Sequence, residues 1–146
     1  MLVRDIQQGD RAQWAGLWQG YLEFYKVPHI APEVTARTWA RFFDAAEPVY
    51  AMVVEEDGVL IGLVQYLFHR STWFVDDICY LQDLFTVPAA RGKGVARALI
   101  EAVYAKAQAR GAPRVYWMTH ETNTTAQVLY DKVAEKSGFI QYRKNF

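Results

Sequence analysis

The 146 residues of this chain suffice for one hydrophobic core, so a single domain is predicted over residues 1–146. Apolar residues make up 52% of the chain, which argues against disorder. Basic and acidic residues are balanced at 16 each, which leaves no general positive field to bind nucleic acid or an anionic membrane. The single cysteine, Cys79, excludes a disulfide framework or a zinc cluster within the chain. Because no leader or long apolar run is present, we expect a cytoplasmic, metal-free protein.

The first third of the chain predicts one strand and two helices. A short strand is expected over 2–6. Apolar residues recur at helical spacing over 11–25, and a second helix over 32–43 has Pro32 near its start.

The middle of the chain predicts a hairpin and a further strand. The β-rich runs 49–55 and 59–68 flank Asp57-Gly58, a dipeptide typical of a tight hairpin turn. The next strand is expected over 78–87 and ends at Pro88.

The last third predicts two helices, each followed by a strand. The clearest helix is 92–110, with Gly111 where a C-terminal cap belongs. A strand over 114–119, a helix over 124–136 and a last strand over 139–143 complete the chain. This order of elements predicts an α/β fold with a mixed sheet.

The stretch from Asp83 to Ala96 carries the clearest chemical signal. It reads as a strand, a glycine-containing loop and a helix, and backbone N–H groups at a helix N-terminus suit a phosphate. A P-loop is excluded because Val95 follows Gly94, and a dinucleotide fingerprint fits poorly because Arg97 occupies the third glycine position. From the loop alone, an ordinary strand-to-helix turn stays open as the alternative.

Residues 91–96, Arg-Gly-Lys-Gly-Val-Ala, match the signature Q/R-x-x-G-x-G/A and resemble the GNAT family of N-acetyltransferases. Downstream, a second block is similar to that family's N-x-x-A-x-x-L-Y-x-K-x-G-F region, and its matching residues are Asn123, Ala126, Leu129, Tyr130, Lys132, Gly138 and Phe139. Residues 133–137 lengthen the gap before the Gly-Phe pair. This departure resembles the histone/polyamine acetyltransferase branch, which includes acetyltransferases of D-amino acids.

The resemblance implies a mixed central sheet of about six to seven strands, helices on both faces, and a splayed central strand pair that admits the arm of acetyl-CoA. The backbone of Phe85, Thr86 and Val87 is implied to pair with this arm, with the Val87 N–H facing the thioester carbonyl. The resemblance also implies a pyrophosphate cradle, which consists of Arg91, Gly92, Lys93, Gly94, Val95 and Ala96.

Catalytic and cofactor-binding roles also follow from the resemblance. Tyr130 matches the acid that protonates the leaving thiolate, with a packed aromatic as the alternative. Asn123 matches a residue that binds the cofactor arm, with a helix N-cap as the alternative. Lys132 meets the 3′-phosphate or is merely exposed.

The acceptor side is less defined by the motifs. Asp83 is predicted to act as base or to hold a cationic substrate, with a local backbone cap as its alternative role and Glu121 as another candidate. Tyr21 and Tyr25 are expected to line the acceptor pocket, because an aromatic wall suits a cationic amine.

The implied function is acetyl transfer from acetyl-CoA to the primary amine of a small polyamine- or amino-acid-like molecule, by direct attack with both substrates bound. Two alternatives stay open: a protein lysine or N-terminus as acceptor, and a non-catalytic CoA-binding module. We expect a homodimer, because the last strand would leave an edge with apolar neighbours.

Overall fold

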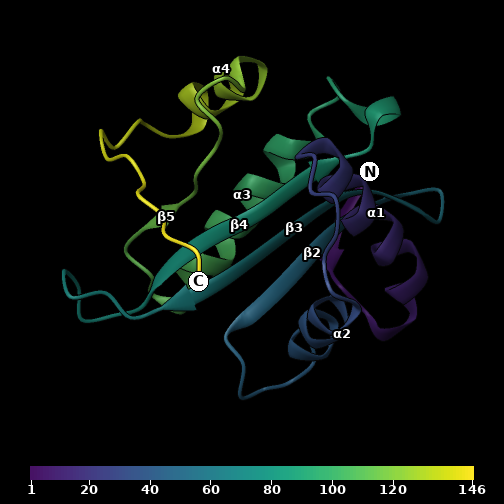
Figure 1. The fold of residues 1–146 in the computed structure, drawn as a ribbon, viewed down its shortest axis with the longest axis horizontal. Coiled ribbons are helices and arrows are strands. Elements are labelled where there is room, and N and C mark those ends of the chain that lie inside the picture. The colour runs from purple at the N-terminus through teal and green to yellow at the C-terminus, as the bar shows by residue number, and fades with distance from the viewer.

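The computed structural model describes residues 1–146 and contains one sheet of five strands. Its elements in chain order are β1 (Leu2–Asp5), η1 (Gln8–Asp10), α1 (Arg11–Phe24), α2 (Pro32–Arg41), β2 (Val49–Glu56), β3 (Val59–His69), β4 (Ile78–Thr86), η2 (Pro88–Ala90), α3 (Val95–Arg110), β5 (Val115–Tyr116) and α4 (Thr124–Val133). The strands lie in the order β1-β2-β3-β4-β5, and Figure 1 shows β2 to β5 in this order. All neighbours are antiparallel except the parallel pair β4–β5.

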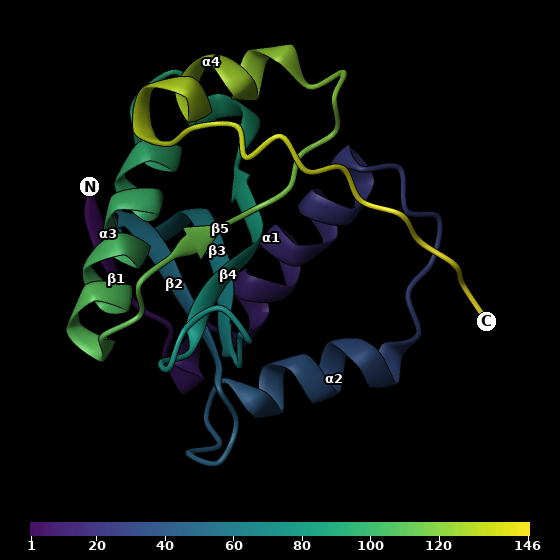
Figure 2. The same ribbon diagram turned by 90° about the vertical axis from the view of Figure 1, so that its left-hand side faces the viewer.

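Two hydrophobic clusters cover the two faces of the sheet. Helices α1 and α2 pack on one face and α3 on the other (Figure 2). Trp14 of α1 and Leu63 of β3 are buried in the first cluster, and Leu99 of α3 and Val64 of β3 are buried in the second. The expected α/β architecture, with helices on both faces of a mixed sheet, is confirmed.

Local backbone chemistry explains where the hairpin and the longest helix begin and end. Asp57 and Gly58 both have positive φ, at 51° and 78°, as a tight hairpin turn requires. Gly94 and Gly111 flank α3 at φ of 82° and 80°, in the left-handed region that favours glycine.

The strand predicted over 139–143 is wrong, and the sheet has five strands rather than six or seven. No hydrogen bond between two backbone groups involves residues 139–143. Their apolar side chains stay exposed, with Phe139 at 78% and Tyr142 at 89%. A strand exists only where a neighbour accepts its backbone hydrogen bonds, and β5 is too short to provide one.

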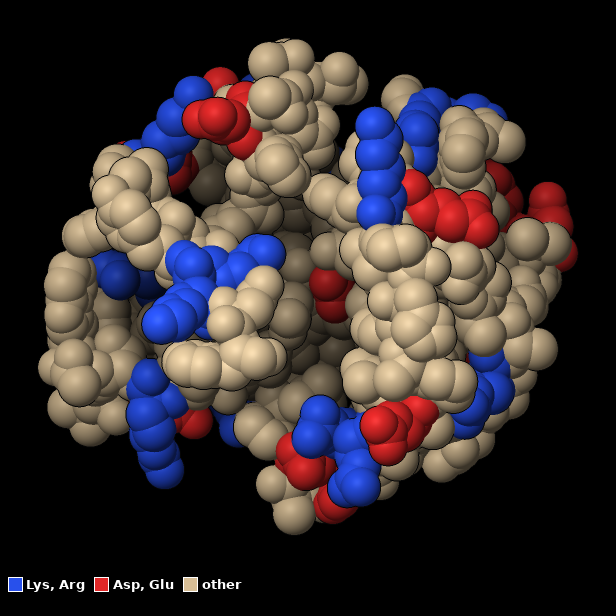
Figure 3. All heavy atoms as spheres, in the orientation of Figure 1, with Lys and Arg blue, Asp and Glu red and all other residues tan.

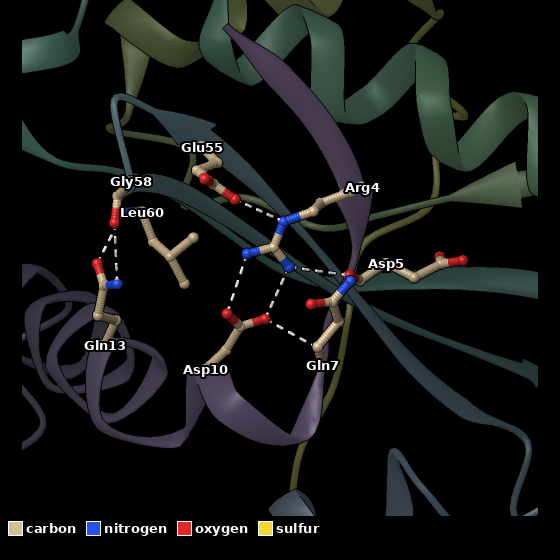
Figure 4. Close-up of polar contacts among 8 residues, drawn as sticks. All are labelled: Arg4, Asp5, Gln7, Asp10, Gln13, Glu55, Gly58 and Leu60. Carbon is tan, nitrogen blue, oxygen red and sulfur yellow. Dashed lines mark hydrogen bonds and ion pairs between the residues drawn. The ribbon is translucent and has the colours of Figure 1, made fainter.

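A half-buried arginine ties β1 to its neighbours (Figure 4). Arg4 donates from Nη1 and Nη2 to both carboxylate oxygens of Asp10, at 2.8 and 3.0 Å, and from Nε to Glu55 at 2.7 Å. The hydrogen bond from Arg4 holds the pKa of Asp10 below its usual value. This network holds the start of α1 against β1 and β2, and so fixes the position of α1 on the sheet.

None of the helices is both long and apolar enough to cross a bilayer. The structure brings together no group of three or more His, Cys, Asp or Glu side chains suited to a metal ion.

Candidate active site

β4 parts from β5 after two residue pairs. Cys79 pairs with Val115 and Tyr80 with Tyr116, and beyond Tyr80 no further residue of β4 pairs with β5. The chain then leaves the sheet after β5, and Figure 1 shows it running from β5 up to α4. The splayed strand pair expected from the sequence is therefore present, and one edge of β4 stays open.

A β-bulge interrupts β4 beside this open edge. Tyr66 of β3 pairs with Leu81, but Gln65, the residue before Tyr66, pairs with Asp83. Gln82 is therefore the extra residue, and it is exposed. A bulge reverses the alternation of side chains and of backbone N–H groups in the rest of the strand.

The reversal turns Asp83 toward α1. Leu81 packs in the cluster on the α3 face, whereas Phe85 packs in the cluster on the α1 face. Asp83 lies two residues before Phe85 and shares its face, beside the buried Gln65. The extra residue Gln82 thus places the carboxyl group of Asp83 on the face of the sheet that α1 covers.

The same reversal corrects the expected role of the Val87 N–H. This group donates to the carbonyl of Ile61 on β3, at 3.0 Å, so it is not available to a thioester. Successive residues of a strand point their backbone N–H groups to opposite edges. The N–H groups of Leu84 and Thr86 therefore point away from the edge that the Val87 N–H faces. Because the N–H of Val87 points to β3, the N–H groups of Thr86 and Leu84 point to the open edge of β4. The carbonyl of Thr86 accepts a hydrogen bond from Nε of Arg91, at 3.2 Å.

The loop after β4 forms a cradle of backbone donors. Gly92 and Gly94 have φ of 76° and 82°, and a Cβ built at either would meet no protein atom within 4 Å. The N–H groups of Gly92, Lys93 and Gly94 make no hydrogen bond within the protein, and α3 begins directly afterwards at Val95. Free donors, open space and a helix N-terminus suit a pyrophosphate.

Asp83 has no cationic partner. Gln65 donates from Nε2 to Oδ2 of Asp83, at 2.8 Å. Burial raises the pKa of Asp83, while hydrogen bonds from Gln65 and Tyr21 lower it. The result is a carboxyl group whose pKa lies above its ordinary value, as a base that works near neutral pH needs.

Aromatic side chains of α1, and of Tyr25 directly after it, lie beside Asp83. Trp18 stacks on Tyr21 with ring centroids 5.2 Å apart, and Tyr21 lies 4.8 Å from Tyr25. Burial and the nearby Asp83 charge raise the pKa of both tyrosines. The indole N–H of Trp18 is buried without a partner. The two tyrosines expected in the acceptor pocket are thus brought together with the carboxyl group.

Tyr130 faces the same region from α4. Its ring packs at 5.4 Å from Trp117, and its hydroxyl makes no hydrogen bond within the protein. Burial raises the pKa of Tyr130 to about 12, with a smaller contribution from Tyr25. A tyrosine of this pKa is fully protonated at neutral pH and can donate a proton.

The other predicted residues divide into near and distant ones. Asn123 lies close enough to Tyr25 to lower its pKa by hydrogen bonding, and donates from Nδ2 to Thr119 at 3.3 Å. It occupies the N-cap position of α4, but its side chain makes no capping hydrogen bond there. Glu121 and Lys132 are exposed, and neither forms an ion pair.

Sequence reasoning missed Gln65 as a site residue. It is 4% exposed, contacts Asp83, and is the only polar side chain in the core of an otherwise apolar strand. A lone amide in such a run needs buried partners, and that was the available signal.

The site as a whole is hollowed. Figure 3 shows a depression in the face that carries α1 and the C-terminal segment, with an acidic side chain visible in its depth. The candidate site consists of the open edge of β4, the free backbone donors of the loop before α3, and the tyrosines Tyr21, Tyr25 and Tyr130. This arrangement can hold an anion at one end and an amine at the other.

Three kinds of similarity connect this chain to known proteins. The sequence model described as "Acetyltransferase (GNAT) family" matches residues 14–134. D-amino-acid N-acetyltransferase HPA3 of Saccharomyces cerevisiae is 40% identical over 147 aligned residues, which cover 99% of this chain and 91% of that protein.

Solved structures share the fold. Ribosomal-protein-alanine N-acetyltransferase from Brucella melitensis biovar Abortus 2308 has a TM-score of 0.81 at 19% identity, with 100% of both chains covered. The aminoglycoside N-acetyltransferase AAC(6')-Iy, in complex with a bisubstrate analog, has a TM-score of 0.84 at 21% identity, with 99% of this chain and 98% of that one covered.

Proposed function

Because the chain belongs to the GNAT family and is an N-acetyltransferase that uses acetyl-CoA, we propose that it acetylates the primary amine of a small, amino-acid-like or polyamine-like molecule. The observation that carries the acceptor proposal is Asp83, a half-buried carboxyl group beside aromatic rings at the open edge of β4. A carboxylate among tyrosines suits a compact cation. The name of the yeast relative, a D-amino-acid N-acetyltransferase, supports the same class.

The loop cradle and the open strand edge would hold acetyl-CoA. The N–H groups of residues 92–96 would bind the pyrophosphate, with Arg91 and Lys93 adding positive charge. Asn123 would bind the cofactor arm, and Lys132 would meet the 3′-phosphate. When bound, acetyl-CoA supplies an acetyl group activated as a thioester.

Asp83 would make the acceptor reactive. An ammonium of pKa about 10 is neutral in only about 0.1% of molecules at pH 7, so attack requires removal of a proton. The raised pKa of Asp83 brings its basicity closer to that pH, and its negative charge attracts the ammonium first. Tyr21 and Tyr25 would surround the bound amine, and Glu121, being exposed, is the weaker candidate for the base.

The backbone N–H of Leu84 would stabilise the negative charge that develops on the carbonyl oxygen. This group faces the open edge and follows Asp83 directly, so base and donor sit side by side. Tyr130, protonated at neutral pH, would give its proton to the departing sulfur.

We expect Asp83→Asn to lower kcat/KM for the amine by about 10²–10⁴-fold, the usual effect of a lost general base. Acetyl-CoA affinity should stay within about twofold, because the carboxyl group lies outside the cradle. The variant should also have a higher Tm at pH 7. An acid whose folded pKa is raised loses stability as pH rises through that pKa, and the amide escapes this loss. Steady-state kinetics and thermal unfolding test both effects.

The matched control is Asp76→Asn, which removes an exposed carboxylate without an ion pair. It should change neither kcat/KM nor Tm. If Asp83→Asn keeps full kcat/KM across pH 6–9, Asp83 is not the base.

We propose that the protein is a homodimer in which a second copy covers the apolar side chains of the C-terminal segment. Ile140, Tyr142 and Phe146 stand exposed beside Phe139, and soluble monomers rarely leave such a group uncovered. Light scattering at micromolar concentration should give twice the chain mass of 16.8 kDa. A mass equal to a single chain at these concentrations would contradict the dimer.

A further inference from the structure

Gln65 is a buried amide whose two ends are both occupied. It lies in the middle of β3, is 4% exposed, and is surrounded along the strand by apolar residues. Trp14 of α1, which is fully buried, donates from Nε1 to Oε1 of Gln65 at 2.9 Å. On the other side, Nε2 of Gln65 donates to Oδ2 of Asp83 at 2.8 Å.

The indole of Trp14 fixes the donor-to-acceptor direction of these two hydrogen bonds. An indole N–H can only donate, so the side-chain oxygen of Gln65 must face Trp14. The amide nitrogen must then face Asp83, and it can only donate. The Gln65 amide therefore cannot flip without losing its bond to Trp14, and Oδ2 of Asp83 accepts a hydrogen bond from Nε2 of Gln65.

We propose that Trp14 and Gln65 are positioning residues, which hold Oδ2 of Asp83 by a hydrogen bond and so orient the carboxylate to take the proton of the acceptor amine. This inference rests on the proposed role of Asp83 as base. Neither residue touches the reacting atoms. Their effect passes through the orientation and charge of the carboxylate alone.

The hydrogen bond from Gln65 stabilises the charged form of Asp83, which has no ion-pair partner. The titratable groups that face it are tyrosines: Tyr21 from α1, Tyr25 directly after α1, and Tyr80 from its own strand. Among the cations, Arg143 of the C-terminal segment acts on Tyr80, whose pKa it lowers. Without an ion pair, the charged form of Asp83 depends on neutral donors, of which Gln65 is the strongest.

The sign of the effect follows directly. The hydrogen bond from Gln65 lowers the pKa of Asp83, against the rise caused by burial. Loss of that donor leaves only the smaller effect of Tyr21 to oppose the rise, so a smaller fraction of Asp83 is deprotonated at a given pH. The acidic limb of the pH profile of kcat/KM, which reports deprotonation of the free enzyme's base, must move to higher pH.

The experiment uses Gln65→Met and the double variant Trp14→Phe/Gln65→Met in the full chain. The double variant removes both hydrogen-bonding partners and so leaves no buried indole N–H orphaned, which protects folding. We expect the acidic limb to move up by about one pH unit in both, the scale of one hydrogen bond to a charged group. The KM for acetyl-CoA should stay within about twofold.

The matched control is Trp39→Phe. Trp39 packs against Trp14 at 5.0 Å in the same cluster, but does not contact Gln65 by a hydrogen bond. It should leave the acidic limb in place. If Gln65→Met lowers kcat/KM equally at every pH, or if Trp39→Phe moves the limb as far, the two residues serve packing only and the proposal is wrong.

A carbon-13 NMR titration of the Asp83 carboxyl group in the free enzyme separates this proposal from the proposed function. We expect its pKa to rise in Gln65→Met, whether or not the enzyme turns over. An unchanged pKa overturns the positioning role. A raised pKa, together with full activity of Asp83→Asn, would sink the base assignment and leave the hydrogen-bonded chain as a structural feature without catalytic effect.

Discussion

Gly94→Glu is expected to weaken acetyl-CoA binding by about 10²-fold or more. The residue lies in the cradle at φ of 82°, directly before the first turn of α3. A glutamate there places negative charge where the pyrophosphate would sit, and juxtaposed like charges cost several kcal/mol. It also removes the glycine that the left-handed backbone favours. Isothermal calorimetry with the folded variant measures the loss.

The matched control is Gly111→Glu, at the other end of the same helix. Gly111 has φ of 80° and open space at its Cβ position, so the strain and the added charge are alike. The helix of 16 residues separates the two sites by about 24 Å. This control should bind acetyl-CoA normally. Equal affinity of the folded Gly94→Glu variant would remove the loop from the cofactor site.

Tyr130→Phe is expected to lower turnover by about 10²–10⁴-fold, the usual range for a lost general acid. The ring stays against Trp117, so acetyl-CoA affinity should change little. With a pKa of about 12, the hydroxyl remains protonated up to about pH 10, so deprotonation of this residue should not limit activity below that pH. Single-turnover kinetics should be used, because slow product release can hide a chemical step.

Tyr104→Phe provides the comparison for this variant. Tyr104 also packs against Trp117, at 6.4 Å, but its hydroxyl donates to the carbonyl of Val133 at 2.8 Å. Its loss should cost some stability and leave the chemical step intact. A chemical rate that is the same for Tyr130→Phe and the wild type would show that the acid lies elsewhere.

The strand–loop–helix unit around Arg91 could be predicted from sequence because its signals are local. Glycines at fixed spacing and apolar residues at helical period identify a loop and a helix without knowledge of distant contacts. Asp83, Tyr130 and the tyrosines of α1 were placed in the site by the family resemblance. The structure does bring them to one region.

The direction of the backbone donors could not be predicted in the same way. The bulge at Gln82 depends on how β4 pairs with β3, and nothing in the residues 81–83 marks it. Without the bulge, the alternation of N–H groups along β4 would point the Val87 N–H to the open edge. In the structure this group points to β3 instead. The strand expected over 139–143 fails for a related reason, because an alternating apolar pattern forms a strand only beside a partner.

Gln65 shows a third limit. Its polarity within an apolar strand was visible, but its partners, Trp14 and Asp83, lie 51 and 18 residues away in the chain. Only the packing of α1 on the sheet brings them together.

The central claim is that this chain transfers an acetyl group from acetyl-CoA to a small primary amine. The most direct measurement incubates the full chain with acetyl-CoA and a panel of D-amino acids, L-amino acids, polyamines, and peptides with a free N-terminus or lysine, and follows released thiol together with the product mass. We predict acetylation of a small amine with kcat/KM of about 10⁴ M⁻¹s⁻¹ or higher. Acetylation of peptides alone would contradict the acceptor, and no thiol release from an enzyme that binds acetyl-CoA would contradict catalysis itself.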